Sequence, residues 1–316
     1  MLDEVAPAIL PIGCALIVMA SALWLHGTLS TRPAGQCCGS VDVTIPPPPG
    51  DRVPHPGNLR PELYARRINY VAALQFQVAT IVASLMCGAA LIYPRICRRE
   101  DRARGVFIFI ILAVGTFFAA TVINEDTSPT LHALIEMTMR HEFASIETMR
   151  FAFERTTSVT ATLLIAVASL FMLPVSGGRQ TRIRELASRH TGLSYLLAVG
   201  TTLLAADVLL KMCAGRWAIA YYVKPAQDSL AELVDGIVSG WAVYDSLVLA
   251  AAYIPATVVL RGRLQREARR VNVKDPPEWF DPQWLTISPV QEISKILAIL
   301  APFLVGQVQD ITKLLS

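Results

Sequence analysis

The chain has 316 residues, of which 53% are hydrophobic and only 17% are charged, and its formal net charge is +3. A soluble domain of this size normally carries about a quarter charged residues. The composition therefore excludes an ordinary soluble protein and indicates a chain largely surrounded by lipid. No nucleic-acid-binding motif is found, and the basic residues lie beside apolar runs, as they do at the flanks of membrane spans.

Six stretches of the chain are long and apolar enough to cross a bilayer as helices. A spanning helix needs about 20 mostly apolar residues, and only the last two of the six contain charged residues. The sequence predicts an all-α fold, a polytopic transmembrane helix bundle. Its six spans are expected near residues 5–25, 68–94, 105–124, 156–178, 193–213 and 236–260.

Arginine-rich segments predict which side of the membrane each connection faces. Cytoplasmic loops collect Lys and Arg close to the spans. Segments 95–104, 179–190 and 261–274 are rich in arginine and alternate along the chain with the other connections. We expect these three segments, and both chain termini, on the cytoplasmic side of the plasma (inner) membrane. The Pro-rich loop 27–67 is expected outside, although it also carries five arginines.

Segment 128–155 has the pattern of an amphipathic helix on the outer side. Ser128 followed by Pro129 is a favourable helix start. Apolar residues then recur at helical spacing. The helix is expected either to lie on the outer leaflet or to continue into the fourth span. Together with the spans it belongs to a transmembrane domain of residues 1–274.

Residues 275–316 are predicted to form a cytoplasmic tail that contains an amphipathic helix. The charge-free part of this helix is short for a span, and Pro302 is expected to kink it. Three uses of its apolar stripe remain open: packing on the bundle, contact with a second copy or a protein partner through 287–316, or a re-entrant element lining a pore. The stripe consists of Ile293, Ile296, Leu297, Leu300, Leu304, Val308, Ile311 and Leu315.

Asp245 is the residue of the predicted bundle whose insertion into the membrane costs the most free energy. An Asp near the centre of a span costs about 2.5–3.5 kcal/mol, and Asp245 lies about 14 Å into the sixth span, counted from Gly236. Its short side chain must find a polar cavity or a hydrogen-bond partner, or carry a proton. Trp241 and Tyr253 share its helix face.

Asp207 and Lys211 lie in the fifth span at a spacing of one helical turn. A pair at the end of the helix explains both residues. The alternative is one polar cluster of Asp207, Lys211 and Asp245, because the estimated depths of the two acids differ by only about 6 Å.

Three cysteines are expected on the outer side. Cys213 could form a disulfide with Cys37 or with Cys38, which would tie the first loop to the end of the fifth span. Adjacent cysteines rarely bond to each other, because the geometry is strained.

The sequence favours a non-enzymatic membrane protein. It contains no hydrolase, metalloprotease, phosphate-loop or dinucleotide motif, so it identifies no catalytic, cofactor or metal-binding residues. The first hypothesis is a membrane scaffold or assembly subunit that works through its tail, in contact with the lipid bilayer. The alternative is an ion or proton channel or transporter that uses Asp245 with Asp207 and Lys211. A membrane enzyme is the third and least favoured class.

Overall fold

The computed structural model describes residues 61–96, 156–175, 177–220, 224–270 and 289–315. These residues are almost entirely helical, and they contain no strand, which confirms the all-α class for this part of the chain. The predicted spans 5–25 and 105–124, the outer helix 128–155 and most of the Pro-rich loop lie outside the described residues. The helices are α2 (Pro61–Ile96), α6 (Thr156–Phe171), α7 (Arg179–Ile219), α8 (Lys224–Ala268) and α9 (Pro289–Leu315).

Three of these helices are long and apolar enough to cross a membrane. They are Ala65–Tyr93 within α2, the whole of α7, and Gln227–Ala268 within α8. They contain the predicted spans 193–213 and 236–260 and all but the last residue of 68–94, and the apolar helical character of these spans is thereby confirmed.

Helices α7 and α8 are longer than the sequence suggested. Their 41 and 45 residues give lengths of about 62 and 68 Å, against about 30 Å for a hydrocarbon core. Segment 179–190, predicted as a loop, is the first part of α7, because it contains neither Pro nor Gly and is rich in good helix formers. The last residues of the predicted loop 27–67 are likewise the first turns of α2.

Helix α6 is shorter than the predicted span 156–178. It ends at Phe171 after 16 residues and is followed by a turn. Pro174 explains the end, because a proline disfavours helical backbone at the residue before it. The absence of charged residues from 156 to 178 showed how long the apolar segment is. The proline limits how much of that segment is helical.

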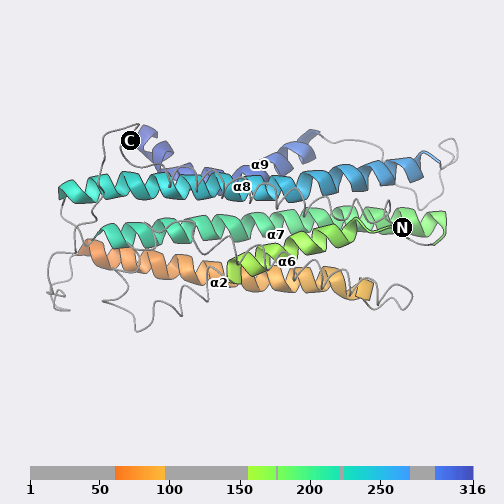
Figure 1. The fold of residues 1–316 in the computed structure, drawn as a ribbon, viewed down its shortest axis with the longest axis horizontal. Coiled ribbons are helices and arrows are strands. Elements are labelled where there is room, and N and C mark those ends of the chain that lie inside the picture. Colours follow the sequence, from red (N-terminus) through yellow and green to blue (C-terminus); the bar gives the residue numbers. More distant parts are fainter. Residues whose placement is uncertain (1–60, 97–155, 176, 221–223, 271–288, 316) are drawn as a thin grey trace, which may run out of the picture.

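Helix α7 lies between α2 and α8 and runs antiparallel to both of them (Figure 1). At one end of the bundle the rings of Tyr70 on α2 and Trp217 on α7 stack with centroids 5.2 Å apart. At the other end Arg182 on α7 pairs with Glu267 on α8 at 3.7 Å. We call this second end the Arg-rich end, since the first turns of α7 and the last turns of α8 place their arginines there.

Helix α2 shows the burial pattern of a helix that faces lipid. Its polar side chains Gln77, Thr80 and Ser84 are buried, whereas large apolar side chains such as Phe76 and Val82 are exposed. Gln77 donates a hydrogen bond of 2.7 Å to the Thr157 hydroxyl of α6. Polar residues that bond between helices, with apolar residues outside, are typical of membrane bundles.

Helix α9 packs in the groove between α7 and α8, and Pro302 determines how it does so. A proline removes the hydrogen bond to the carbonyl four residues earlier. That carbonyl, of Ala298, accepts a bond of 3.1 Å from the Thr201 hydroxyl of α7. The next amide, of Phe303, donates to the Ser246 hydroxyl of α8 at 3.2 Å. Both backbone groups at the proline site are thus satisfied by the bundle, as buried backbone groups require.

The apolar stripe of α9 is not what packs on the bundle. Helix α9 buries Ile299 and Pro302 on the bundle and leaves the predicted stripe outward. The hypothesis that the stripe covers the protein's own helices is therefore wrong for the part that the structure describes. The exposed members are Ile293, Ile296, Leu297, Leu300 and Leu304, whose exposed fractions run from 41% to 57%.

Candidate functional site

The candidate site is a group of charged and aromatic residues between α7 and α8, nearer the end with Tyr70 and Trp217 than the Arg-rich end. Lys211 and Asp207 on α7 form an ion pair with 2.5 Å between the ammonium nitrogen and a carboxylate oxygen. The two residues are one helical turn apart, so α7 by itself sets this geometry. Both side chains are largely buried, which makes the pair far less exposed to solvent screening than a surface pair.

An aromatic ring from α8 completes the surroundings of Lys211. The Lys211 ammonium lies over the Trp241 indole, 4.2 Å from the ring centroid. A cation at this position is attracted by the electron-rich face of the ring. Trp241 is itself held by an edge-to-face contact with Tyr244, at a centroid distance of 5.5 Å and an interplanar angle of 89°.

Asp245 lies on α8 one helical turn beyond Trp241. It is only 6% exposed, and its Oδ2 atom is buried without a hydrogen-bond partner in the described part of the chain. Its carboxyl interacts electrostatically with the Lys211 ammonium and the Asp207 carboxyl. Buried polar atoms nearly always find a partner, so a lone carboxylate oxygen inside a helix bundle needs an explanation.

The structure thus brings four of the five predicted site residues together. Of the two arrangements left open by the sequence, it has features of both: Asp207 and Lys211 are paired, and the pair faces Asp245 across the α7–α8 interface. We call Asp207, Lys211, Trp241 and Asp245 the charge cluster. It contains one basic side chain and two carboxyl side chains.

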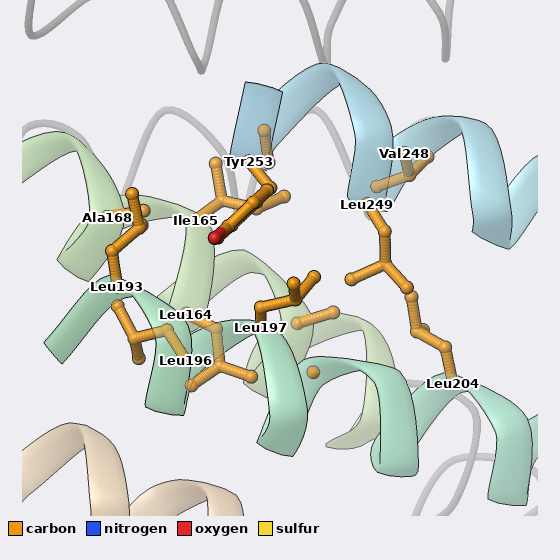
Figure 2. A pocket seen from close by; sticks show the side chains of 13 residues that line it. Leu164, Ile165, Ala168, Leu193, Leu196, Leu197, Leu204, Val248, Leu249 and Tyr253 are labelled. Carbon is orange, nitrogen blue, oxygen red and sulfur yellow. The ribbon is translucent and has the colours of Figure 1, made fainter. Parts of the chain in front are cut away.

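Tyr253, the fifth predicted residue, belongs to a different place. It lies eight residues, or about 12 Å, along α8 from Asp245. There it lines an apolar cavity between α6, α7 and α8 (Figure 2). Sharing a helix face did not bring it to the charge cluster, because the distance along the helix axis separates the two.

A second buried polar network, at the Arg-rich end, was missed from the sequence. Arg189 on α7 pairs with Glu185 at 3.0 Å and donates to the carbonyls of Phe171 and Leu173. Arg263 on α8 donates to the intervening carbonyl of Met172. Two arginines thereby satisfy the final carbonyl of α6, that of Phe171, and the carbonyls of the two residues in the turn that follows. The spacing of Glu185 and Arg189 was a signal for the pair, whereas nothing local indicated the carbonyls.

The predicted disulfide stays a prediction. Cys213 is a free thiol within the described residues and is partly buried. Cys37 and Cys38 lie outside them.

Metal binding finds no support in the described helices. They contain no group of three or more His, Cys, Asp or Glu side chains that could hold a metal ion.

Comparisons with known proteins do not place the chain in a family. No protein-family model matches it, and neither the curated proteins nor the solved structures contain a significant match.

Proposed function

We propose that this protein is a multi-pass membrane protein that carries protons across the bilayer, with Asp245 as the proton-binding group. The observation that carries the proposal is the buried Oδ2 atom of Asp245, which has no hydrogen-bond partner in the described residues. It lies in a helix that is long and apolar enough to span the membrane. Ionisable residues at such positions are costly and commonly mark ion or proton pathways.

The charges of the cluster favour a proton over a metal cation. With a proton on Asp245, the charges of Asp207, Lys211 and Asp245 sum to zero, and without it they sum to −1. A single carboxylate oxygen can hold a proton, whereas a hard metal cation takes six or more oxygen ligands. The Lys211 ammonium would also repel a metal cation at this position.

Lys211 and Trp241 suggest how access to Asp245 is controlled. Trp241 precedes Asp245 by one turn, and the ammonium on its ring lies between the two helices. We therefore expect Lys211 to shift between the two carboxyl groups as Asp245 gains and loses its proton.

Proton flux into liposomes that contain the purified protein tests the proposal. A pH-sensitive dye should report flux for the wild type and none for Asp245→Asn, which keeps the shape of the side chain and cannot exchange the proton. Asp235→Asn is the matched control, because Asp235 is also on α8 but pairs with Arg216 at 3.2 Å, away from the cluster. Equal flux in the wild type and Asp245→Asn, or none in folded wild-type protein, would contradict proton transport.

We place the Arg-rich end in the cytoplasm, following the arginine distribution. Support comes from the gathering of arginines from α7 and α8 at one end, where the Arg179 guanidinium bonds the Arg270 carbonyl at 3.2 Å. Helix α9 runs antiparallel to α8, since Gln307 bonds Ser239 at 3.1 Å and the earlier Phe303 bonds Ser246. We therefore revise the expected side of the C-terminus from cytoplasmic to the opposite side.

A reporter fused after residue 316 tests this orientation. Alkaline phosphatase, which becomes active outside the cytoplasm, should be active in the fusion, and a cytoplasm-dependent fluorescent protein should stay dark. The reverse result would return the C-terminus to the cytoplasm.

A membrane assembly subunit is the second candidate function. The exposed stripe of α9 favours it, because the bundle does not use these side chains. Leu297→Ala with Leu300→Ala should then lower the oligomeric state in nanodiscs, measured by native mass spectrometry. Val78→Ala with Val82→Ala on the exposed face of α2 is the control. An unchanged monomer in all variants would count against assembly through this stripe.

A further inference from the structure

A cavity of about 50 Å³ lies between α6, α7 and α8. Of the 13 residues that line it, Tyr253 is the only one whose side chain carries a polar atom (Figure 2). The rest of the lining is leucine, isoleucine, valine, alanine and glycine. Such a lining suits hydrocarbon, and the volume is enough for a few methylene groups, with the remainder of a chain extending from the opening.

Tyr253 supplies one hydrogen-bond donor to this cavity. The residue is 7% exposed, and its hydroxyl makes no hydrogen bond within the described part of the chain. The ring extends from α8 into the cavity, which Ile165 and Ala168 of α6 also line (Figure 2). A ligand with one hydrogen-bond acceptor would give this hydroxyl a partner inside the cavity.

The position of the cavity along the helices indicates the direction of such a ligand. One end is lined by Leu204 and Val248, each three residues, or about 4.5 Å, from Asp207 and Asp245 of the charge cluster. The other end is lined by Leu193, which is one turn from Arg189 in the Arg-rich network. The cavity therefore extends from near the middle of the spans toward the basic end.

We propose that this cavity binds one acyl chain of a phospholipid from the leaflet at the Arg-rich end, and that Tyr253 donates a hydrogen bond to its ester carbonyl. The apolar lining suits the acyl chain, and the Tyr253 hydroxyl can donate to the ester carbonyl. The arginines at the Arg-rich end, beyond the cavity, match an anionic headgroup. The proposal does not depend on proton transport by Asp245.

Two photoactivatable lipids test the proposal. Phosphatidylglycerol with a diazirine in one chain is made with ester-linked chains and, separately, with ether-linked chains that have no carbonyl. Both are incorporated into nanodiscs that hold the full chain. In the wild type we expect cross-links in peptides 161–168, 193–204 and 248–253, with the ester lipid labelling about fivefold more than the ether lipid. In Tyr253→Phe the two lipids should label equally.

Variants that fill the cavity separate this site from general lipid contact. Ala161→Phe places a ring into the cavity from α6 and should remove the cross-links. Ala90→Phe is the same change on the exposed face of α2 and should leave them unchanged. If Ala161→Phe does not fold, the ratio of cross-linking by the ester lipid to cross-linking by the ether lipid in Tyr253→Phe still tests the proposal.

Two results would overturn the proposal. One is equal labelling by the ester and ether lipids in the wild type, which would remove the role of the carbonyl. The other is displacement of the probe by a long-chain quinone at equimolar amount but not by unlabelled phosphatidylglycerol, which would replace the phospholipid by another carbonyl-bearing lipid.

Discussion

The Lys211 ammonium on α7 lies 4.2 Å from the ring centroid of Trp241 on α8 while it pairs with Asp207 on its own helix. The ion pair is therefore local to α7, but the aromatic contact ties it to α8. Asp245, one turn further along α8, becomes part of the same electrostatic group only through this juxtaposition.

Removing Lys211 should destabilise the protein more than removing the whole pair. Lys211→Met leaves the Asp207 carboxylate buried without its cation, and breaking a buried pair in this way costs about 3–5 kcal/mol. Adding Asp207→Asn should recover a large part of that loss. Unfolding midpoints in detergent for the two variants check this, and a double variant less stable than Lys211→Met would contradict it.

Trp241→Leu should lower stability by about 1–2 kcal/mol through loss of the cation–π contact. Trp241→Tyr keeps an aromatic face and should lose less. The comparison is a double-mutant cycle with Lys211→Met, because a cation–π contact predicts that the effect of Trp241→Leu shrinks when the cation is absent. Strict additivity would show that the indole contributes by packing alone.

Gly306 should be the least replaceable glycine of the described helices. A Cβ atom there would lie 2.7 Å from the Ala242 Cβ of α8, so Gly306→Ala should push α9 away at a cost of about 1–3 kcal/mol. Ala242→Gly should rescue it. Gly240→Ala meets nothing within 4 Å and serves as the control. A neutral Gly306→Ala would mean that α9 does not dock as described.

Arg189→Met should cost about 3–5 kcal/mol, because it removes the basic partner of the buried Glu185 carboxylate and the donor to the Phe171 and Leu173 carbonyls. Arg184→Met removes an exposed arginine from the same helix and should change stability by less than about 0.5 kcal/mol. Thermal unfolding of both proteins measures the difference. Equal midpoints would show that other groups satisfy the α6 terminus.

Much of the fold follows from the sequence wherever apolar length is the deciding property. The predicted spans 68–94, 193–213 and 236–260 all lie within helices long enough to cross a membrane, because about 20 apolar residues cannot avoid helix in lipid. Helix ends were less accurate. A run without charges indicates which residues contact hydrocarbon, but a helix continues until something interrupts its backbone. Pro174 interrupts the backbone after α6, whereas nothing interrupts α7 through 179–190.

The sequence by itself determined the helical class, the membrane character and the identity of the costly residues Asp207, Lys211 and Asp245, because these depend on composition and on spacing within one helix. Tertiary structure alone decided which of them meet, that Tyr253 faces an apolar cavity, and that α9 packs through Pro302 and not through its leucine stripe. Contacts between helices depend on how each helix is rotated and on where backbone groups need partners. Such contacts join residues far apart in the chain, as with Lys211 near Asp245, 34 positions apart, and Thr201 bonded to Ala298, 97 positions apart.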